Sequence, residues 1–421
     1  MKKKEKILIY AHYYTPDVAS TGQILKELAE GMLEVFDITI ICVVPSYTGK
    51  IASKYKNKMF YKEELNGVNV VRIRVPEFSK NNKYSRVKNI FSYYFGAMIA
   101  TLRVGNMDYV FSISQPPILG GLLGVWGKWM KRAKYIYNIQ DFNPEQTMAV
   151  GYSKNKMILN AMMWFDKFSC NQADKVIVVG RDMVETLKAR FINKRVPNHS
   201  FVNNWIDEKE IYPLSTDNRK VLDFKKKYRL EDKFIIMYSG NIGLYYDLEN
   251  IMRVLRKFPA GVKTIDGKEI VFVFVGEGTV KEKLIELKDK YNMENILFIP
   301  YQEKKDLVYS LNACDIQMCI SAAGIKGVSV PSKLYGIMAA GKPILGVLEK
   351  GSEARLIIEE TKCGIVSNPG DYHTFEKNID RILSISRNEY VEMGKAGREY
   401  LENHLTKDVS IMKYIKEIKS C

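Results

Sequence analysis

Short runs of β-branched and aromatic residues alternate with helical segments along almost the whole chain, and this pattern constrains the fold most strongly. The runs form two series, at 7–11, 38–44, 68–75, 109–114, 134–140 and 176–179, and then at 234–238, 271–275, 296–299, 316–320 and 343–347. Strands that alternate with helices predict parallel sheets. We therefore expect an α/β fold made of two Rossmann-like, doubly wound halves of similar size.

The break between the two series indicates where the domains divide. With 421 residues, the chain is long enough for two domains that each have a core. We expect a first domain at 1–207 and a second at 208–390, which begins with a polar linker and an entry helix. We expect C-terminal helices at 391–421 to cross back to the first domain.

The chain is strongly basic, with 64 Lys and Arg against 48 Asp and Glu and a formal net charge of +16. Such an excess favours anionic partners. No nucleic-acid-binding motif is present, so we expect phosphorylated ligands and an anionic membrane surface instead. The six cysteines are scattered and form no C-x-x-C pair, which indicates reduced thiols in a cytoplasmic protein. The apolar run at 7–10 is too short for a signal peptide, and no apolar run is long enough to span a membrane.

Two loops of the first half follow predicted strands and should share one rim of the sheet, where such folds bind ligands. One loop contains His12, Thr21 and Gly22, and the other contains Asp141 and Glu145. A positioned carboxylate can accept the proton that an attacking hydroxyl loses, so Asp141 is a candidate base. Glu145 equally fits the first turn of a helix, and Thr21 and Gly22 equally fit a helix-capping turn. His12 equally fits an ordinary residue of the rim.

The second half contains a stretch typical of a phosphate site. Residues 327–345 predict a turn, a helix that begins near Pro331 and Ser332, and a break into a buried strand. Lys333 adds a positive charge at the helix start, where it would suit a phosphate. An ordinary, tightly packed turn from helix to strand explains the same residues.

Further phosphate ligands are expected in the loops after two strands. Gly240 and Asn241 follow one strand, where a backbone without side chains can approach a phosphate. Lys281 follows Gly276-Glu277-Gly278, although it also fits a solvated helix face. The Gly-x-Gly-x-x-Gly pattern is absent, which disfavours a nicotinamide cofactor. No Asp-x-Asp motif is present, so no metal site is expected.

The order of motifs resembles glycosyltransferase family 4, in particular the surface-polysaccharide subgroup with fucosamine-type and colanic-acid-type transferases. Seven short motifs carry the resemblance: 16–22, 140–145, 204–207, 238–243, 275–278, 330–336 and 351–353. The resemblance implies a GT-B fold, in which two Rossmann-like domains face each other across a cleft. It also implies that Gly22 approaches the substrates, and that Leu334 belongs to the donor site.

One departure from the family concerns nucleotide recognition. Many members carry two glutamates around the predicted helix, where this sequence has Val328 and Gly336. The ribose-binding role of the second glutamate therefore cannot be transferred. Glu353 is a candidate substitute.

The resemblance and the charge together predict a metal-independent glycosyltransferase with no cofactor beyond its nucleotide-sugar co-substrate. The expected donor is a UDP-linked, N-acetylated amino sugar, and the expected acceptor is a lipid-linked saccharide. Asp141 would be the base of an inverting reaction or would bind donor hydroxyls in a retaining one. A UDP-sugar 2-epimerase and a catalytically inactive nucleotide-sugar-binding scaffold remain alternatives. The sequence gives no indication of an oligomeric state.

Three stretches are candidates for docking on the inner face of the cell membrane, because they combine apolar and basic residues. These stretches are 90–102, 157–165 and 50–62. The first two also fit core helices, which we expect for each of them. The polar 50–62 segment is expected to be a loop and the better membrane candidate.

Overall fold

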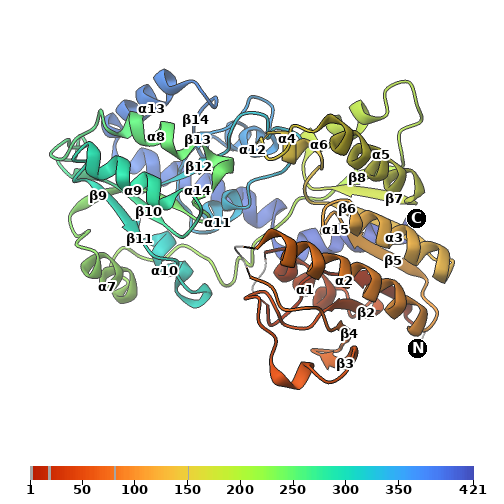
Figure 1. The fold of residues 1–421 in the computed structure, drawn as a ribbon. Helices are drawn as coiled ribbons and strands as arrows, with labels where there is room; N and C mark the ends of the chain where they lie inside the picture. Colours follow the sequence, from red (N-terminus) through yellow and green to blue (C-terminus); the bar gives the residue numbers. More distant parts are fainter. Residues whose placement is uncertain (1–2, 18–19, 80–81, 150) are drawn as a thin grey trace. The chain divides into compact units, whose positions relative to one another are not determined.

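The computed structural model describes residues 3–17, 20–79, 82–149 and 151–421. The chain divides into two compact units, of which unit 1 comprises Met1–Asn204 and Ser410–Cys421, and unit 2 comprises Trp205–Val409 (Figure 1). Each unit is built around one sheet that is largely or entirely parallel, as the alternating pattern predicts.

Unit 1 contains an eight-stranded sheet in the order β3-β4-β2-β1-β5-β6-β7-β8. All neighbouring strands are parallel except β3 and β4. The strands are β1 (Glu5–Tyr10), β2 (Phe36–Val43), β3 (Phe60–Leu65), β4 (Val68–Ile73), β5 (Tyr109–Ile113), β6 (Lys134–Ile139), β7 (Lys175–Val178) and β8 (His199–Phe201). The helices are α1 (Ser20–Gly31), α2 (Lys83–Arg103), α3 (Leu119–Lys131), α4 (Glu145–Ala149), α5 (Lys156–Gln172) and α6 (Arg181–Arg190).

Unit 2 contains a six-stranded parallel sheet in the order β11-β10-β9-β12-β13-β14. Its strands are β9 (Lys233–Ser239), β10 (Glu269–Val275), β11 (Ile296–Ile299), β12 (Ile316–Ile320), β13 (Ile344–Val347) and β14 (Gly364–Ser367). Its helices are α7 (Arg219–Lys227), α8 (Leu248–Leu255), α9 (Lys281–Lys290), α10 (Leu307–Asn312), α11 (Lys333–Ala339), α12 (Glu353–Thr361), α13 (Tyr372–Ser384) and α14 (Arg387–His404).

The order of strands locates the switch point of each sheet. In unit 1 the chain builds outward from β1 to β2 and then returns to place β5 on the other side of β1. In unit 2 the corresponding point lies between β9 and β12. Ligands of doubly wound sheets bind beyond the carboxyl ends of the strands at such points. The loops after β1, β5, β6, β9 and β12 are therefore where the functional residues should lie.

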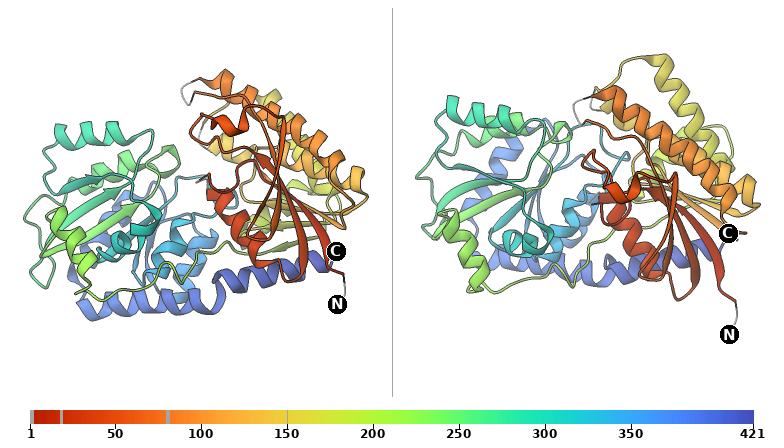
Figure 2. Two further views of the ribbon diagram at one scale, coloured as in Figure 1. Left: turned by 90° about the horizontal axis from the view of Figure 1, so that it is seen from below. Right: turned by 60° about the horizontal axis from the view of Figure 1, so that its bottom comes forward.

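The C-terminal part differs from the expected division at 391. Helix α14 packs against α11 and α12 within unit 2, and α15 (Lys407–Lys419) belongs to unit 1 from Ser410 onward. In unit 1, Tyr414 Oη accepts a hydrogen bond from Asn138 Nδ2 (3.0 Å), and Lys175 Nζ lies 2.9 Å from Glu417 Oε2. Figure 2 shows this end of α15, in blue, beside the strands of unit 1. The helical periodicity of 387–419 does not reveal that the chain changes units at 409–410.

The expectation that 50–62 forms a loop is wrong for residues 60–62, which belong to a strand. Strand β3 begins at Phe60 and pairs antiparallel with β4 at the edge of the sheet. Tyr55 is buried and donates a hydrogen bond to Glu63 Oε1 (2.6 Å). The polar sequence of β3 hides it from pattern analysis, because an edge strand buries little of either face.

Helix α2 buries Tyr93 together with several small residues, and it exposes a row of large apolar residues. Gly96, Ala97 and Ala100 are buried against the sheet. A Cβ on Gly96 would lie only 2.5 Å from Ile73 Cγ2, so the helix approaches β4 closely. Six large apolar residues on the outer face are exposed, namely Tyr84, Val87, Phe91, Phe95, Ile99 and Leu102. The expectation that this stretch is an ordinary core helix therefore holds for only one of its faces.

Candidate donor and acceptor sites

Three polar side chains form a chain of contacts at the switch point of unit 1. Thr21 Oγ1 donates a hydrogen bond to Gln115 Oε1 (2.9 Å), and Gln115 Nε2 lies 3.5 Å from Asp141 Oδ2. The loops after β5 and β6 and the first turn of α1 supply these residues. Thr21 and Asp141, both predicted from the sequence, are thus brought together by Gln115, which the sequence analysis missed.

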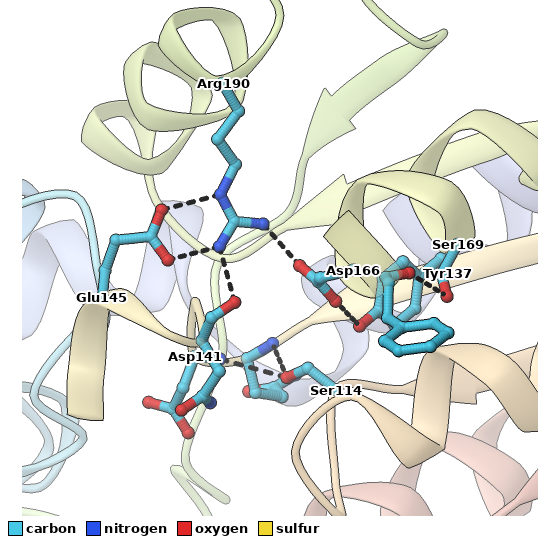
Figure 3. Close-up of polar contacts among 10 residues, drawn as sticks. Ser114, Tyr137, Asp141, Glu145, Asp166, Ser169 and Arg190 are labelled. Carbon is cyan, nitrogen blue, oxygen red and sulfur yellow. Dashed lines mark hydrogen bonds and ion pairs between the residues drawn. The ribbon is translucent and has the colours of Figure 1, made fainter. Parts of the chain in front are cut away.

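The environment of Asp141 suits a group that exchanges protons near neutral pH. Burial raises the pKa of Asp141 from 3.8 to about 6, while hydrogen bonds from Gln115 and Gln146 oppose the shift. The backbone N–H of Asp141 points to Ser114 Oγ (3.3 Å), which fixes the start of the loop (Figure 3). A general base works best when its pKa lies close to the working pH. Asp141 meets this condition.

Asp141 opens onto a pocket of about 190 Å³ within unit 1. The pocket is lined mainly by polar and aromatic side chains, among them His12, Tyr13, Asn89 and Gln146. Its volume lies below the range of roughly 300–1,000 Å³ for whole ligand sites, so it encloses only part of a larger ligand. Amide and carboxylate groups of this kind suit the hydroxyls of a sugar.

His12 also lines this pocket, and its predicted contact with the acceptor stays a prediction. Its ring stacks on that of Tyr93, with 4.8 Å between the ring centres. Burial lowers the pKa of His12 to about 4, and a contact with Asn89 opposes this shift only in part. The imidazole is therefore neutral at pH 7 and can offer one donor or one acceptor.

Glu145 is engaged away from the pocket. Arg190 Nε donates to Glu145 Oε1 (2.8 Å), and Arg190 Nη2 binds the other carboxylate oxygen (Figure 3). Arg190 also pairs with Asp166, donates to the carbonyl oxygen of Asn143 (2.8 Å), and lies over the Phe142 ring at 4.2 Å. With both oxygens of Glu145 bound to one arginine, its place in this structure is that of an anchor for the loop and not of a base.

Gly22 is a buried residue in the first turn of α1, next to Thr21. Ser20, the first residue of the helix, precedes it. This position agrees with the helix-start reading of the sequence. Its expected approach to the substrates stays a prediction.

In unit 2, Lys333 lies across the end of β9. Its ammonium is 3.6 Å from the centre of the Tyr246 ring and 4.9 Å from that of Tyr238. Gly240 has a φ of +139°, and a Cβ there would lie 2.6 Å from Lys333 Cε. Only glycine therefore accommodates both the backbone conformation and the lysine. Gly240 and Lys333, distant in sequence, form one site.

The Lys333 ammonium loses its proton more readily than that of an ordinary lysine. Burial lowers the pKa of Lys333 to about 8, and the sulfur of Cys319 opposes this only weakly. Among the described residues, no carboxylate forms an ion pair with it. The two tyrosine rings supply the remaining attraction for the cation. A phosphate brought to this position would gain a cation that no protein anion neutralises.

The neighbouring loops pack closely around Gly240. A Cβ on Gly276 would lie 2.0 Å from the carbonyl oxygen of Gly240, so the loops after β9 and β10 touch through their backbones. Lys281 Nζ binds the carbonyl oxygen of Gly276 (3.1 Å) and Glu277 Oε1 (2.7 Å). Lys281 therefore stabilises the loop after β10. Asn241 is exposed and its amide lies close to Gly243.

The remaining residues predicted for the donor site differ in how exposed they are. Ser332 is exposed directly before α11, where a ligand can reach it. Leu334 is fully buried and its backbone N–H donates to the carbonyl oxygen of Pro331 (3.1 Å), so its side chain belongs to the core. Glu353 is 2% exposed at the start of α12. Its proposed contact with ribose stays a prediction.

The two positions where the family often has glutamate are both buried. Val328 is 5% exposed. A Cβ on Gly336 would lie 3.6 Å from Ile206 Cδ1 and 3.7 Å from Leu311 Cδ1. A side chain at position 336 would thus begin among apolar groups.

Within the part of the chain that the structure describes, no group of three His, Cys, Asp or Glu residues is placed to hold a metal ion. The five cysteines at 42, 170, 314, 319 and 363 are buried free thiols, and Cys421 is half-buried and also free. Across 3–17, 20–79, 82–149 and 151–421, no helix is both long and apolar enough to cross a bilayer.

Two family descriptions match the two units. Residues 20–199 match the glycosyl transferase 4-like domain, and residues 220–400 match the glycosyl transferases group 1 family. WbjE of Pseudomonas aeruginosa, named as a glycosyltransferase, is 27% identical over 81% of this chain and 82% of its own length. WcaI of Escherichia coli K12, named as a colanic acid biosynthesis glycosyl transferase, is 22% identical over 98% of this chain and all of its own.

Solved structures show the same fold. The sucrose-phosphate synthase of Thermosynechococcus elongatus superposes with a TM-score of 0.77 at 13% identity and covers 99% of both chains. HepE of Anabaena, crystallised with UDP and glucose, superposes with a TM-score of 0.70 at 13% identity, over 99% of this chain and 100% of that one.

The two Rossmann-like units, the two family matches and the shared fold define a glycosyltransferase with the GT-B fold. The chain belongs to the group 1 glycosyl transferases, with a glycosyl transferase 4-like first domain. The resemblance drawn from its motifs is confirmed.

Proposed function

We propose that this glycosyltransferase moves an N-acetylated amino sugar from a UDP-linked donor to a lipid-linked saccharide in the biosynthesis of a surface polysaccharide. The names of WbjE and WcaI support the glycosyl transfer, and that of WcaI supports the polysaccharide setting. The UDP bound to HepE supports the nucleotide. The enzyme would work at the inner face of the cell membrane, without a metal or a further cofactor.

The observation that carries the proposal is Lys333 at the end of β9. Breaking the glycosidic bond leaves a negative charge on the departing UDP, which must be stabilised in the transition state. Lys333 lies at the switch point next to Gly240, whose lack of a side chain leaves room for it, and has no carboxylate partner among the described residues. It can therefore bind the diphosphate without first breaking an ion pair.

Asp141 would act in unit 1, where the pocket would hold the reacting end of the acceptor. In an inverting reaction, Asp141 accepts the proton of the acceptor hydroxyl as its oxygen bonds to the anomeric carbon and UDP departs. In a retaining reaction, Asp141 would instead bind hydroxyls of the donor sugar. The raised pKa of Asp141 is compatible with either role.

The outer face of α2 supports membrane association. Its exposed stripe of Tyr84, Val87, Phe91, Phe95, Ile99 and Leu102 repeats every three or four residues. The helix contains no acidic residue, while Lys83, Arg86, Lys88 and Arg103 carry positive charge. Basic groups beside an apolar helical face are typical of helices that lie in the interface of an anionic bilayer.

A groove of about 690 Å³ runs beside this stripe and could accommodate an acyl or isoprenoid chain. It is lined by Met59, Phe91, Phe95 and Ile99, with Arg74 and Lys88 among its polar members. Helix α5 adds exposed Met157, Ile158 and Trp164 in the same unit. These helices, and not the 50–62 segment, are now the better membrane candidates.

A transfer assay tests this proposal. The purified protein is incubated with a panel of UDP- and GDP-sugars and with vesicles that contain lipid-linked saccharides. We expect UDP release that requires the acceptor, lengthens the lipid-linked saccharide and persists in EDTA. Epimerised donor without acceptor would favour the 2-epimerase. Tight binding of the donor with neither transfer nor hydrolysis would favour an inactive scaffold.

Vesicle sedimentation tests the membrane surface separately. We expect binding to vesicles with anionic lipid and little binding to neutral ones, because the flanking charges supply part of the attraction. Phe95→Glu should release the protein, whereas Ile265→Glu, a control at an exposed apolar residue of unit 2, should not. Equal binding of both variants would contradict the assignment of α2.

A further inference from the structure

The acceptor pocket of unit 1 has one basic side chain at its edge. Arg86, on α2, lines the same pocket as Asn89, Gln115 and Asp141. It is exposed, and within the described part of the chain no hydrogen bond or ion pair holds its guanidinium. Among the described residues that line the pocket, no other Arg or Lys occurs.

The nearby acidic groups do not neutralise Arg86. Asp17 and Arg86 both interact electrostatically with the hydroxyl of Tyr13. The oxygens of Asp17, however, accept hydrogen bonds from the backbone N–H groups of Ser46 (3.0 Å) and Tyr47 (3.2 Å). Asp141 is the acidic residue that lines the pocket itself, and Gln115 contacts it. Arg86 is therefore a free cation at the boundary of a polar pocket.

Helix α2 arranges three kinds of chemistry in one order. Asn89 belongs to the polar pocket, Arg86 lies one turn earlier at its edge, and Val87 and Phe91 belong to the exposed apolar stripe. A molecule that fits this order has a sugar, then an anionic group, then a hydrocarbon chain. A saccharide linked to an isoprenoid or acyl chain through phosphate has this order.

We propose that Arg86 binds the phosphate group that joins the acceptor saccharide to its lipid. The inference rests on the proposed lipid-linked acceptor. It adds that the protein recognises the phosphate of this acceptor and that Arg86 is the residue that binds it. Arginine suits this role because its planar group can bind two phosphate oxygens at once. Binding at Arg86 would place the sugar beyond the phosphate in the pocket that contains Asp141.

Calorimetry with three probes tests the proposal without any turnover, with UDP present to occupy the donor site. The probes are geranyl diphosphate, inorganic diphosphate and geraniol, in the absence of vesicles. We expect geranyl diphosphate to bind tightest of the three. Arg86→Gln should weaken this binding about tenfold or more, as the loss of a charge-assisted hydrogen bond implies, and Arg86→Lys by less.

Lys88→Gln is the matched control, because Lys88 is an exposed cation on the same helix that lines the apolar groove and not the acceptor pocket. It should leave the affinity for geranyl diphosphate within about twofold. Both positions are exposed, so thermal unfolding of the variants should match that of the native chain.

Three results would overturn the proposal. If geranyl diphosphate does not bind, or binds the Arg86→Gln variant as tightly as the native chain, Arg86 is not part of the acceptor site. Inorganic diphosphate that binds as tightly as geranyl diphosphate would show a site for free anions instead. Because these measurements need no transfer, they are independent of the assay for the proposed function: sugar transfer with an unaffected Arg86→Gln would sink only this inference.

Discussion

Replacing Arg190 by Met should destabilise unit 1 severely. The Arg190 side chain is 3% exposed and faces Asp166, which is 4% exposed, and Glu145, which is 18% exposed. Met roughly preserves the volume but leaves two carboxylates without a cation in the interior. Removing one partner of a buried ion pair costs about 3–5 kcal/mol, and we expect the loss to lie in this range.

The size of this loss should depend on pH. Burial already raises the pKa of Asp166, and the charge of Arg190 opposes that shift. Without Arg190, the folded variant favours protonated carboxyls more strongly. Groups whose pKa is raised on folding contribute stability at low pH and lose it as the pH rises through the folded-state pKa. The deficit relative to the native chain should therefore be larger at pH 8 than at pH 5.

Urea unfolding followed by tryptophan fluorescence measures this effect. Trp126, Trp129 and Trp164 lie in unit 1 and only Trp205 lies in unit 2, so the signal reports mainly on unit 1. Arg195→Met, at an exposed position nearby, is the control and should change stability by less than about 0.5 kcal/mol. A loss below about 1 kcal/mol for Arg190→Met, or one independent of pH, would refute the reasoning.

Three further predictions concern the two sites. Asp141→Asn should slow transfer while leaving UDP affinity nearly unchanged. Because burial raises the pKa of Asp141 to about 6, the native residue costs stability above that pH, so the variant should be the more stable form at pH 8 by chemical denaturation and lose this advantage near pH 4. Lys333→Ala should weaken UDP binding by about 1.5–3 kcal/mol in calorimetry. Native affinity should fall as the pH rises through about 8, where Lys333 loses its proton, and no such fall should occur in the variant. Gly240→Ala should displace Lys333 and weaken UDP binding, whereas Gly261→Ala, which also has a positive φ but open space around its Cβ, should affect stability alone. Equal UDP affinity of the two glycine variants would contradict the contact between Gly240 and Lys333.

The predicted strands agree with the structure to within a few residues at most ends, because buried parallel strands are continuous apolar runs. Strands β3, β8 and β14 were missed. Two of them form the outer edges of the first sheet and the third an edge of the second, where a strand has only one neighbour and its apolar pattern is weak.

The site could be predicted only as separate pieces. Asp141, Thr21, Gly240 and Lys333 each stand out because they follow strands or begin helices. Their actual partners do not, because Gln115 and Tyr246 are ordinary residues at ordinary positions. Glu145 shows the same limitation, since nothing in its local sequence indicates that Arg190 binds it from α6.

The sequence alone determined the α/β class, the two sheets and the family of this protein, because these depend on local periodicity and on short motifs in order. Tertiary structure alone decided which charges are free and which are bound. Lys281 and Glu145 bind partners within the protein, whereas Lys333 rests on two tyrosine rings. It also decided that α2 turns its large apolar residues outward. The physical reason is the same in both cases: the environment of a side chain depends on neighbours that only the folded chain brings near.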